Sequence, residues 1–101
     1  MILYNVTINI NESVHDDWLE WMKTKHIPDV LATGLFTGSK IFKIMTDKEE
    51  GNTYSIQYYL DSFEDYEKYR KDFAPKLQEE HSIKYNNKFT AFRTIMESIE
   101  K

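Results

Sequence analysis

Residues 2–11 alternate between two kinds of side chain, and this alternation constrains the fold more than any other feature of the sequence. The even positions carry Ile2, Tyr4, Val6, Ile8 and Ile10. The odd positions carry Leu3, Asn5, Thr7, Asn9 and Asn11. Ten residues with a period of two predict a β-strand, because successive side chains of a strand point to opposite faces. We expect the even residues to face a core and the odd residues to form a polar but uncharged face.

A helical segment is expected after this strand. Apolar side chains recur at helical spacing over residues 14–22, and Lys25 continues the spacing. The Ser13 hydroxyl is suited to cap the first turn. Pro28 disfavours helical geometry at the residue before it, so we expect a break there. A short second turn over residues 29–32 then ends at Gly34.

Three further strands and a second helix complete the pattern. Strands are predicted over residues 36–45, 53–60 and 89–99. The charged segment 47–52 contains a glycine and is typical of a hairpin turn. The second helix is expected to begin at Asp61 or Ser62 and to kink or restart at Pro75.

The element order β-α-β-β-α-β predicts an α+β fold of the ferredoxin-like kind. Residues 1–101 are short enough for a single domain. Because crossover connections are right-handed, the strands form an antiparallel sheet in the order 4-1-3-2, with both helical segments on one face. The other face of such a sheet is open.

Composition excludes several classes of function. The chain has no cysteine, so disulfides, thiolate metal sites and cysteine nucleophiles are excluded. Its net charge of -4 lacks the basic footprint of nucleic-acid binding. No apolar run reaches the ~20 residues of a membrane span, and residues 1–5 lack the features of a secretion signal. We therefore expect a cytoplasmic protein without nucleic-acid or membrane partners.

The open face is the most informative surface of the predicted fold. Uncharged polar side chains are unusual on a solvated sheet, so we expect a homodimer in which two open faces meet. The same groups could line a cleft that binds a small polar or aromatic molecule. The ligand-binding candidates are Asn5, Thr7, Asn9, Gln57, Tyr59 and Arg93. The placement of Arg93 is open, because the pattern of the last strand does not decide which of its two faces is the exposed one.

Several motifs resemble those of known families. The segment from His26-Ile27-Pro28-Asp29 to Gly34-Leu35-Phe36 resembles the dimeric α/β-barrel superfamily, which includes antibiotic-biosynthesis monooxygenases and muconolactone isomerases. The chain is more similar still to one uncharacterised bacterial family of about this length, a domain of unknown function. This closer resemblance rests on Trp18-Leu19-Glu20-Trp21-Met22, the His26 segment, Pro75-Lys76-Leu77 with His81, and Phe92-Arg93-Thr94. The resemblance implies the fold and dimerisation, and it implies no activity.

Three histidines are candidates for chemistry. His26 could act as a base, but a helix cap that binds the last carbonyls is the favoured interpretation. His81 could be an axial haem ligand, as in some related barrels, but a solvated helix end is favoured. His15 is expected at the surface. His26 and Asp29 alone do not make a metal site, and neither a metal nor a cofactor is predicted.

The two tryptophans of the first helix have a structural explanation. Trp18 is expected to pack in the core, and Trp21 to lie at a helix–helix or interface edge. An aromatic cage or a flavin platform is the alternative for both.

Two functional hypotheses remain open. The favoured one is a small dimeric protein that binds a small molecule or serves an interaction role at the sheet face, because spacing alone places no acid–base pair. The alternative is a cofactor-independent oxygenase or isomerase, with His26, Tyr59 and Arg93 as catalytic candidates. An enclosed volume that holds these groups favours an enzyme, whereas an interface in which they bind one another favours the first hypothesis.

Overall fold

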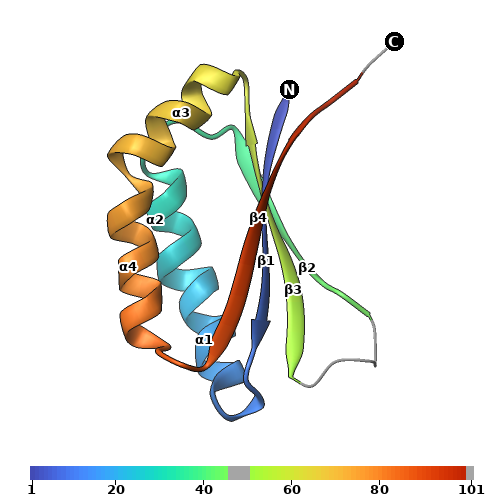
Figure 1. The fold of residues 1–101 in the computed structure, drawn as a ribbon, viewed down its shortest axis with the longest axis vertical. Coiled ribbons are helices and arrows are strands. Elements are labelled where there is room, and N and C mark those ends of the chain that lie inside the picture. Colours follow the sequence, from blue (N-terminus) through green and yellow to red (C-terminus); the bar gives the residue numbers. More distant parts are fainter. Residues whose placement is uncertain (46–50, 100–101) are drawn as a thin grey trace.

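A four-stranded antiparallel sheet forms one layer of the structure (Figure 1). A computed structural model describes residues 1–45 and 51–99. The strands are β1 (Ile2–Ile10), β2 (Gly38–Lys43), β3 (Asn52–Leu60) and β4 (Phe89–Glu97). Their order is β2-β3-β1-β4, with β1 and β3 in the centre. This order confirms the predicted ferredoxin-like topology.

The helices form a second layer on one side of the sheet (Figure 1). The first connection contains a short 3-10 turn (Glu12–Val14), α1 (His15–Trp21), a π-helical turn (Met22–His26) and α2 (Ile27–Leu31). The second contains α3 (Phe63–Asp72) and α4 (Ala74–Lys84). No helix within residues 1–45 and 51–99 is both long and apolar enough to span a membrane.

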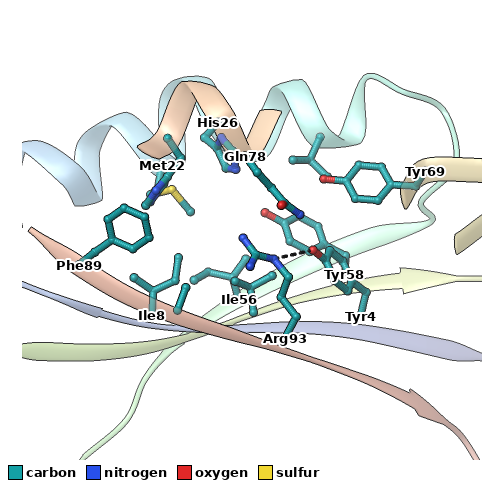
Figure 2. Close-up of a pocket in the computed structure, with 14 residues that line it drawn as sticks. Tyr4, Ile8, Met22, His26, Ile56, Tyr58, Tyr69, Gln78, Phe89 and Arg93 are labelled. Carbon is teal, nitrogen blue, oxygen red and sulfur yellow. Dashed lines mark hydrogen bonds between the residues drawn. The ribbon is translucent and has the colours of Figure 1, made fainter. Parts of the chain in front are cut away.

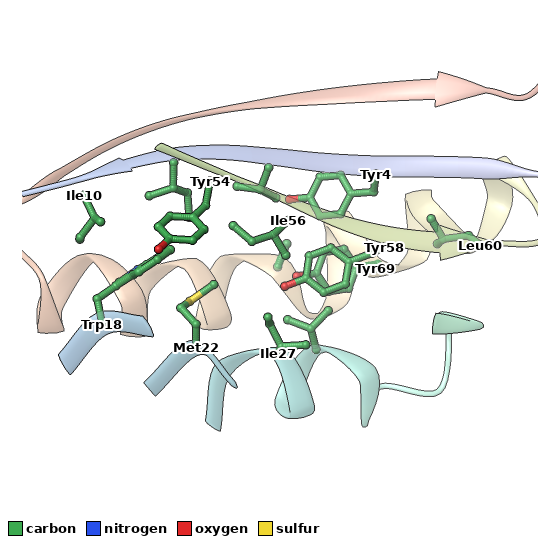
Figure 3. Close-up of a cluster of buried hydrophobic side chains, with 14 of the residues drawn as sticks. Tyr4, Ile10, Trp18, Met22, Ile27, Tyr54, Ile56, Tyr58, Leu60 and Tyr69 are labelled. Atoms are coloured by element: carbon green, nitrogen blue, oxygen red, sulfur yellow. The ribbon is translucent and has the colours of Figure 1, made fainter. Parts of the chain in front are cut away.

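The core lies between these two layers. The even residues of β1, and those of β3 from Tyr54 to Leu60, are buried, as the alternation predicts. Figure 3 shows Trp18 and Met22 reaching from the first helical segment toward Tyr54 and Ile56 of β3. Burial of each such aliphatic or aromatic side chain contributes about 1.5–3 kcal/mol, so this contact between layers fixes the helices on one face.

The first helical segment begins two residues earlier than the sequence suggests. Asn11, rather than Ser13, is the capping residue: its Oδ1 accepts a hydrogen bond from the backbone N–H of Ser13 at 2.8 Å. The short 3-10 turn that follows shifts the cap toward the strand. At the second helix Ser62 is the cap, because its hydroxyl accepts from the N–H of Asp65.

The predicted break before Pro28 does not occur. Ile27 keeps helical angles, with φ -62° and ψ -44°. Met22–His26 forms a π-helical turn, and Pro28 falls in the first turn of α2, where its missing N–H is not needed. The helical path therefore continues through His26.

Two predicted strands are shorter than expected. β2 covers Gly38–Lys43 within the predicted range 36–45, and β4 ends at Glu97. The hairpin turn assigned to residues 47–52 falls largely on residues 46–50, which lie outside the described residues.

Candidate functional site

The register of the strands decides which side chains share the open face. Asn5 of β1 lies opposite Gln57 of β3 and Thr94 of β4. The open face of β4 therefore carries Thr90, Phe92, Thr94 and Met96. Arg93 lies opposite Val6 instead, on the face that the helices cover. Five of the six ligand-binding candidates share the open face, and Arg93 does not.

A continuous row of hydrogen bonds crosses the centre of the open face. The Tyr59 hydroxyl donates to Gln57 Oε1 at 3.1 Å, and Gln57 Nε2 donates to Ser55 Oγ at 3.3 Å. Ser55 Oγ then donates to Asn5 Oδ1 at 2.6 Å, and Asn5 Nδ2 to Thr7 Oγ1 at 2.9 Å. We call these five residues the polar row. Its members bind one another, which is the arrangement expected of an interface.

Exposed apolar side chains flank the polar row. Phe42 and Ile44 stand on the β2 side with exposed fractions of 48% and 37%, and Phe92 and Met96 stand on β4 with 63% and 40%. We call these four residues the apolar rim. Lys40 on the edge strand β2 is the charged residue of this face within the described strands. A hollow of about 250 Å³ lies between Thr7, Asn9, Thr53, Ile44, Thr90 and Phe92.

A second, smaller volume lies on the other side of the sheet. This helix–sheet cavity measures about 30 Å³ and lies between β1, β3, β4 and the helices (Figure 2). Apolar and aromatic side chains form most of its wall. Its polar lining comes from Tyr4, His26, Tyr58, Tyr69, Gln78, His81 and Arg93.

Arg93 reaches this cavity from the edge strand β4. Its Nε donates to the Tyr4 hydroxyl at 3.2 Å, and Figure 2 shows the guanidinium group pointing from the strand toward the helices. Burial raises the pKa of Tyr4, and the Arg93 charge and hydrogen bond partly offset that rise. Arg93 itself is exposed and makes no ion pair with any described residue.

His26 is not a helix cap, in contrast to the favoured interpretation. The helix continues past it, and its ring stacks on Trp21 with centroids 5.1 Å apart. Its Nδ1 is buried without a hydrogen-bond partner among the described residues. Burial lowers the pKa of His26 to about 4, despite the opposing charges of Glu80 and Asp29. His26 is therefore neutral at physiological pH.

His81 is buried, which contradicts the expectation of a solvated helix end. Its side chain is in the core with 6% of its surface exposed, and its Nε2 accepts a hydrogen bond from Trp18 Nε1 at 2.9 Å. Burial, followed by His26 and Arg93, lowers the pKa of His81 to about 4. The His26 and His81 rings lie 5.7 Å apart. No cluster of three or more potential metal ligands occurs within residues 1–45 and 51–99.

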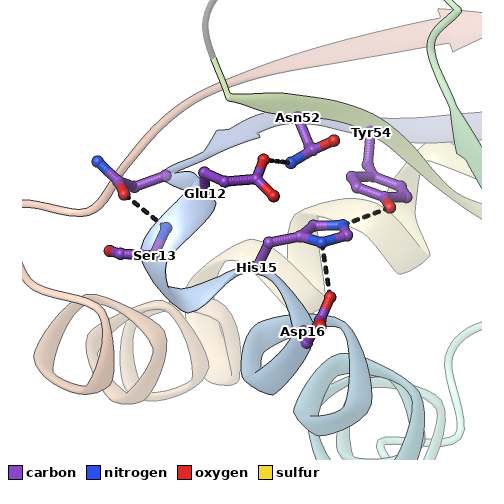
Figure 4. A network of polar contacts seen from close by, with 7 residues as sticks. Glu12, Ser13, His15, Asp16, Asn52 and Tyr54 are labelled. Atoms are coloured by element: carbon purple, nitrogen blue, oxygen red, sulfur yellow. Dashed lines mark hydrogen bonds and ion pairs between the residues drawn. The ribbon is translucent and has the colours of Figure 1, made fainter.

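His15 also lies deeper than expected. Its Nε2 is 2.7 Å from the Tyr54 hydroxyl and its Nδ1 is 3.0 Å from Asp16 (Figure 4). Only 15% of its side chain is exposed. These contacts hold the start of α1 against β3. The core position of Trp18 and the edge position of Trp21 match their predictions.

Comparison with known proteins gives one family and a set of similar structures. The model of a family described as a domain of unknown function (DUF4286) matches residues 1–99. A search of curated proteins found no match. All similar structures discussed below are under 25% identical and therefore support the fold alone.

Three solved structures illustrate this likeness. A dimeric ferredoxin-like protein from an uncultured marine organism has 17% identity and a TM-score of 0.69, covering 100% of this chain and 97% of that one. An EthD family protein from Bacillus halodurans has 14% identity and a TM-score of 0.67, with coverages of 98% and 100%. A variant of SnoaB, a cofactor-independent oxygenase from Streptomyces nogalater, has 8% identity and a TM-score of 0.65, with coverages of 99% and 94%.

Proposed function

Because the chain belongs to the DUF4286 family, whose function is unknown, we propose a function from the geometry of its own surfaces. The protein works in the bacterial cytoplasm as a homodimer that binds a small molecule, and its two copies join through the open sheet face. The observation that carries this proposal is the polar row flanked by the apolar rim.

The internal hydrogen bonds of the polar row lower the desolvation free energy that burial of the open face requires. A polar group that enters an interface without a partner costs about 1–3 kcal/mol, but the polar row already forms hydrogen bonds within one chain. The apolar rim gains about 25 cal/mol for each Å² removed from water. A second copy presents the same combination, so the surface is complementary to itself around a two-fold axis.

The hollow on the open face is the proposed binding site for the small molecule. The hollow of about 250 Å³ on the open face is bounded by hydroxyl and amide groups of Thr7, Asn9 and Thr90. Ile44 and Phe92 of the apolar rim bound it as well. A second sheet laid over it would close the hollow into a cleft with few, convergent polar groups, which suits a small polar or aromatic ligand.

The dimer can be tested with one matched pair of variants. Phe92→Lys places a charge on the open face, whereas Ile83→Lys places the same charge at an exposed site on α4; the two wild-type side chains are 63% and 73% exposed. We expect light scattering to give twice the 12.1 kDa chain mass for the wild type and Ile83→Lys, and the single chain mass for Phe92→Lys. A monomeric wild type at micromolar concentration would contradict the proposal.

An oxygenase or isomerase is the second candidate function. The unpartnered Nδ1 of His26 favours it, since a neutral imidazole in an enclosed site can accept a proton. The volume of about 30 Å³ argues against it, because an aromatic substrate does not fit without displacement of Tyr58 or Phe89. The test compares oxygen uptake and solvent-deuterium incorporation with activated carbonyl substrates between the wild type and His26→Gln. No difference between them would remove this candidate.

A further inference from the structure

We propose that the helix–sheet cavity is a second ligand site, which binds the carboxylate of a small organic acid through Arg93 and Tyr4. The site is separate from the dimer interface, because Arg93 and Tyr4 lie on the helix-covered face of the sheet. The proposed dimer and the proposed site can therefore be tested independently of each other.

Arg93 supplies the charge. Its Nε is held by the Tyr4 hydroxyl at 3.2 Å, so the guanidinium has a fixed orientation at the cavity. None of the described acidic residues pairs with it. The remaining N–H groups of a guanidinium form a planar fork that matches the two oxygens of a carboxylate.

Tyr4 supplies a second donor. Its oxygen accepts from Arg93, so its own O–H proton can donate to an anion beside the guanidinium. The charged groups that act on His26 are Glu80, Asp29, Lys25 and Arg93, and of these four Arg93 alone lines the cavity. Arg93 is thus the charged residue of the cavity lining at neutral pH. Its positive charge suits the site to an anion.

The size of the cavity limits the ligand. A single water needs about 10–15 Å³ of such volume, so a cavity of about 30 Å³ admits only a few heavy atoms. Val30, Ile56 and Phe89 form apolar walls beside the polar groups. The ligand that fits this cavity is a carboxylate with no alkyl chain or a very short one. Formate and acetate are therefore the direct probes.

His26 and His81, which both line the cavity, provide a readout. An anion beside them stabilises their protonated forms, so bound acetate raises the pKa of His26 and His81 from about 4. By linkage, the carboxylate anion binds more tightly once these histidines are protonated. Acetate itself takes up a proton in the same pH range, so formate, the anion of a stronger acid, is the better probe of this effect. A ligand at a remote surface site would leave both titrations unchanged.

The experiment is an NMR titration of the histidine ring protons with acetate, formate and the neutral analogue acetamide. We expect acetate and formate, but not acetamide, to shift the signals of His26 and His81 and to raise their pKa. Arg93→Gln is expected to weaken acetate binding about ten-fold or more, and Arg93→Lys less. Arg70→Gln is the matched control, because Arg70 is exposed on α3 and paired with Glu67.

Three results would overturn the site. The first is that acetate shifts neither histidine signal at concentrations that leave a free histidine analogue unaffected. The second is an equal response to acetamide, and the third is equal acetate affinity in the wild type and Arg93→Gln. Arg93 is exposed, so its replacement leaves the core intact. The histidine titration of the wild type also tests the site without any variant. The mass of the same samples shows separately whether the dimer has formed.

Discussion

The indole N–H of Trp18 donates a hydrogen bond to Nε2 of His81 at 2.9 Å, across 63 positions of the chain. The bond joins α1 to α4 beneath the sheet. An indole N–H can only donate, so His81 Nε2 must offer a lone pair and the ring is neutral. This single contact fixes both the orientation of the imidazole and the distance between the two helical segments.

Replacement of Trp18 should therefore be costly. Trp18→Phe leaves a cavity and an unsatisfied His81 nitrogen, and we expect the free energy of unfolding to fall by about 2–3 kcal/mol. Trp21→Phe is the control, since Trp21 is only half-buried and its indole N–H makes no hydrogen bond with a described residue. Urea denaturation followed by circular dichroism measures both. Equal losses would show that the hydrogen bond is not the reason for the burial of His81.

Stability should fall as the pH falls from about 6.5 toward 4. Burial lowers the pKa of His26 and His81 from 6.5 to about 4. Between these values the unfolded chain takes up protons that the folded chain does not, so the free energy of unfolding decreases with decreasing pH, by a few kcal/mol in all. Below both values no further change from these groups follows.

The proton count can be measured directly. The slope of unfolding free energy against pH near pH 5 should include nearly two protons from these histidines in the wild type. His26→Gln should remove about one of them, while the contribution of the carboxylates stays the same in both proteins. A slope that is unchanged in His26→Gln would mean that His26 is already protonated in the folded protein.

The polar row should show energetic coupling between its members. Ser55 Oγ donates to Asn5 Oδ1 at 2.6 Å from the neighbouring strand. In a double-mutant cycle with Asn5→Ala and Ser55→Ala, we expect a coupling energy of about 1 kcal/mol. Asn5→Ala with Thr33→Ala is the control, because Thr33 bonds Val30 at the end of α2. Additive losses in the first cycle would show that the polar row is not a connected network.

Two glycines with the same backbone angle should respond differently to alanine. Gly34 and Gly51 both have φ 81°, where a side chain is strained by about 1–2 kcal/mol. A Cβ at Gly34 meets nothing within 4 Å, whereas one at Gly51 lies 2.7 Å from the carbonyl oxygen of Ile10. Gly51→Ala should therefore lower the melting temperature clearly more than Gly34→Ala. Similar shifts for the two variants would mean that the β1 end moves freely.

The fold was predictable from the sequence because its central strands carry their buried apolar side chains on one face. The alternation of β1 and β3 places Ile8 and Ile56 in the core without ambiguity. β4 lies at the edge, where Phe92 is exposed and Arg93 points to the helix-covered side. A long basic side chain can reach from an edge strand over apolar surface, so residue type did not identify its face.

The site was less predictable because α4 buries a histidine and exposes an isoleucine, the reverse of the usual preference. His81 is buried while Ile83, two positions later, is 73% exposed. The Trp18 indole donates a hydrogen bond to His81, and the Phe89 ring lies edge-on to the imidazole with centroids 4.3 Å apart. These partners stabilise a histidine at this core position. Such partners come from distant parts of the chain, and helical spacing within α4 does not reveal them.

The π-helical turn at Met22–His26 has a consequence for how relatives of this chain can diverge. Single-residue insertions are usually confined to loops, but a π turn accommodates one extra residue within a helix. Trp18, Met22, His26 and Val30 thereby keep to one side of the segment at intervals of four residues. A relative that lacks this extra residue would present a different side chain to the cavity even if every other position were the same. Comparison of family members should therefore permit a one-residue gap here, since an ungapped alignment would equate the cavity histidine of one protein with a surface residue of another.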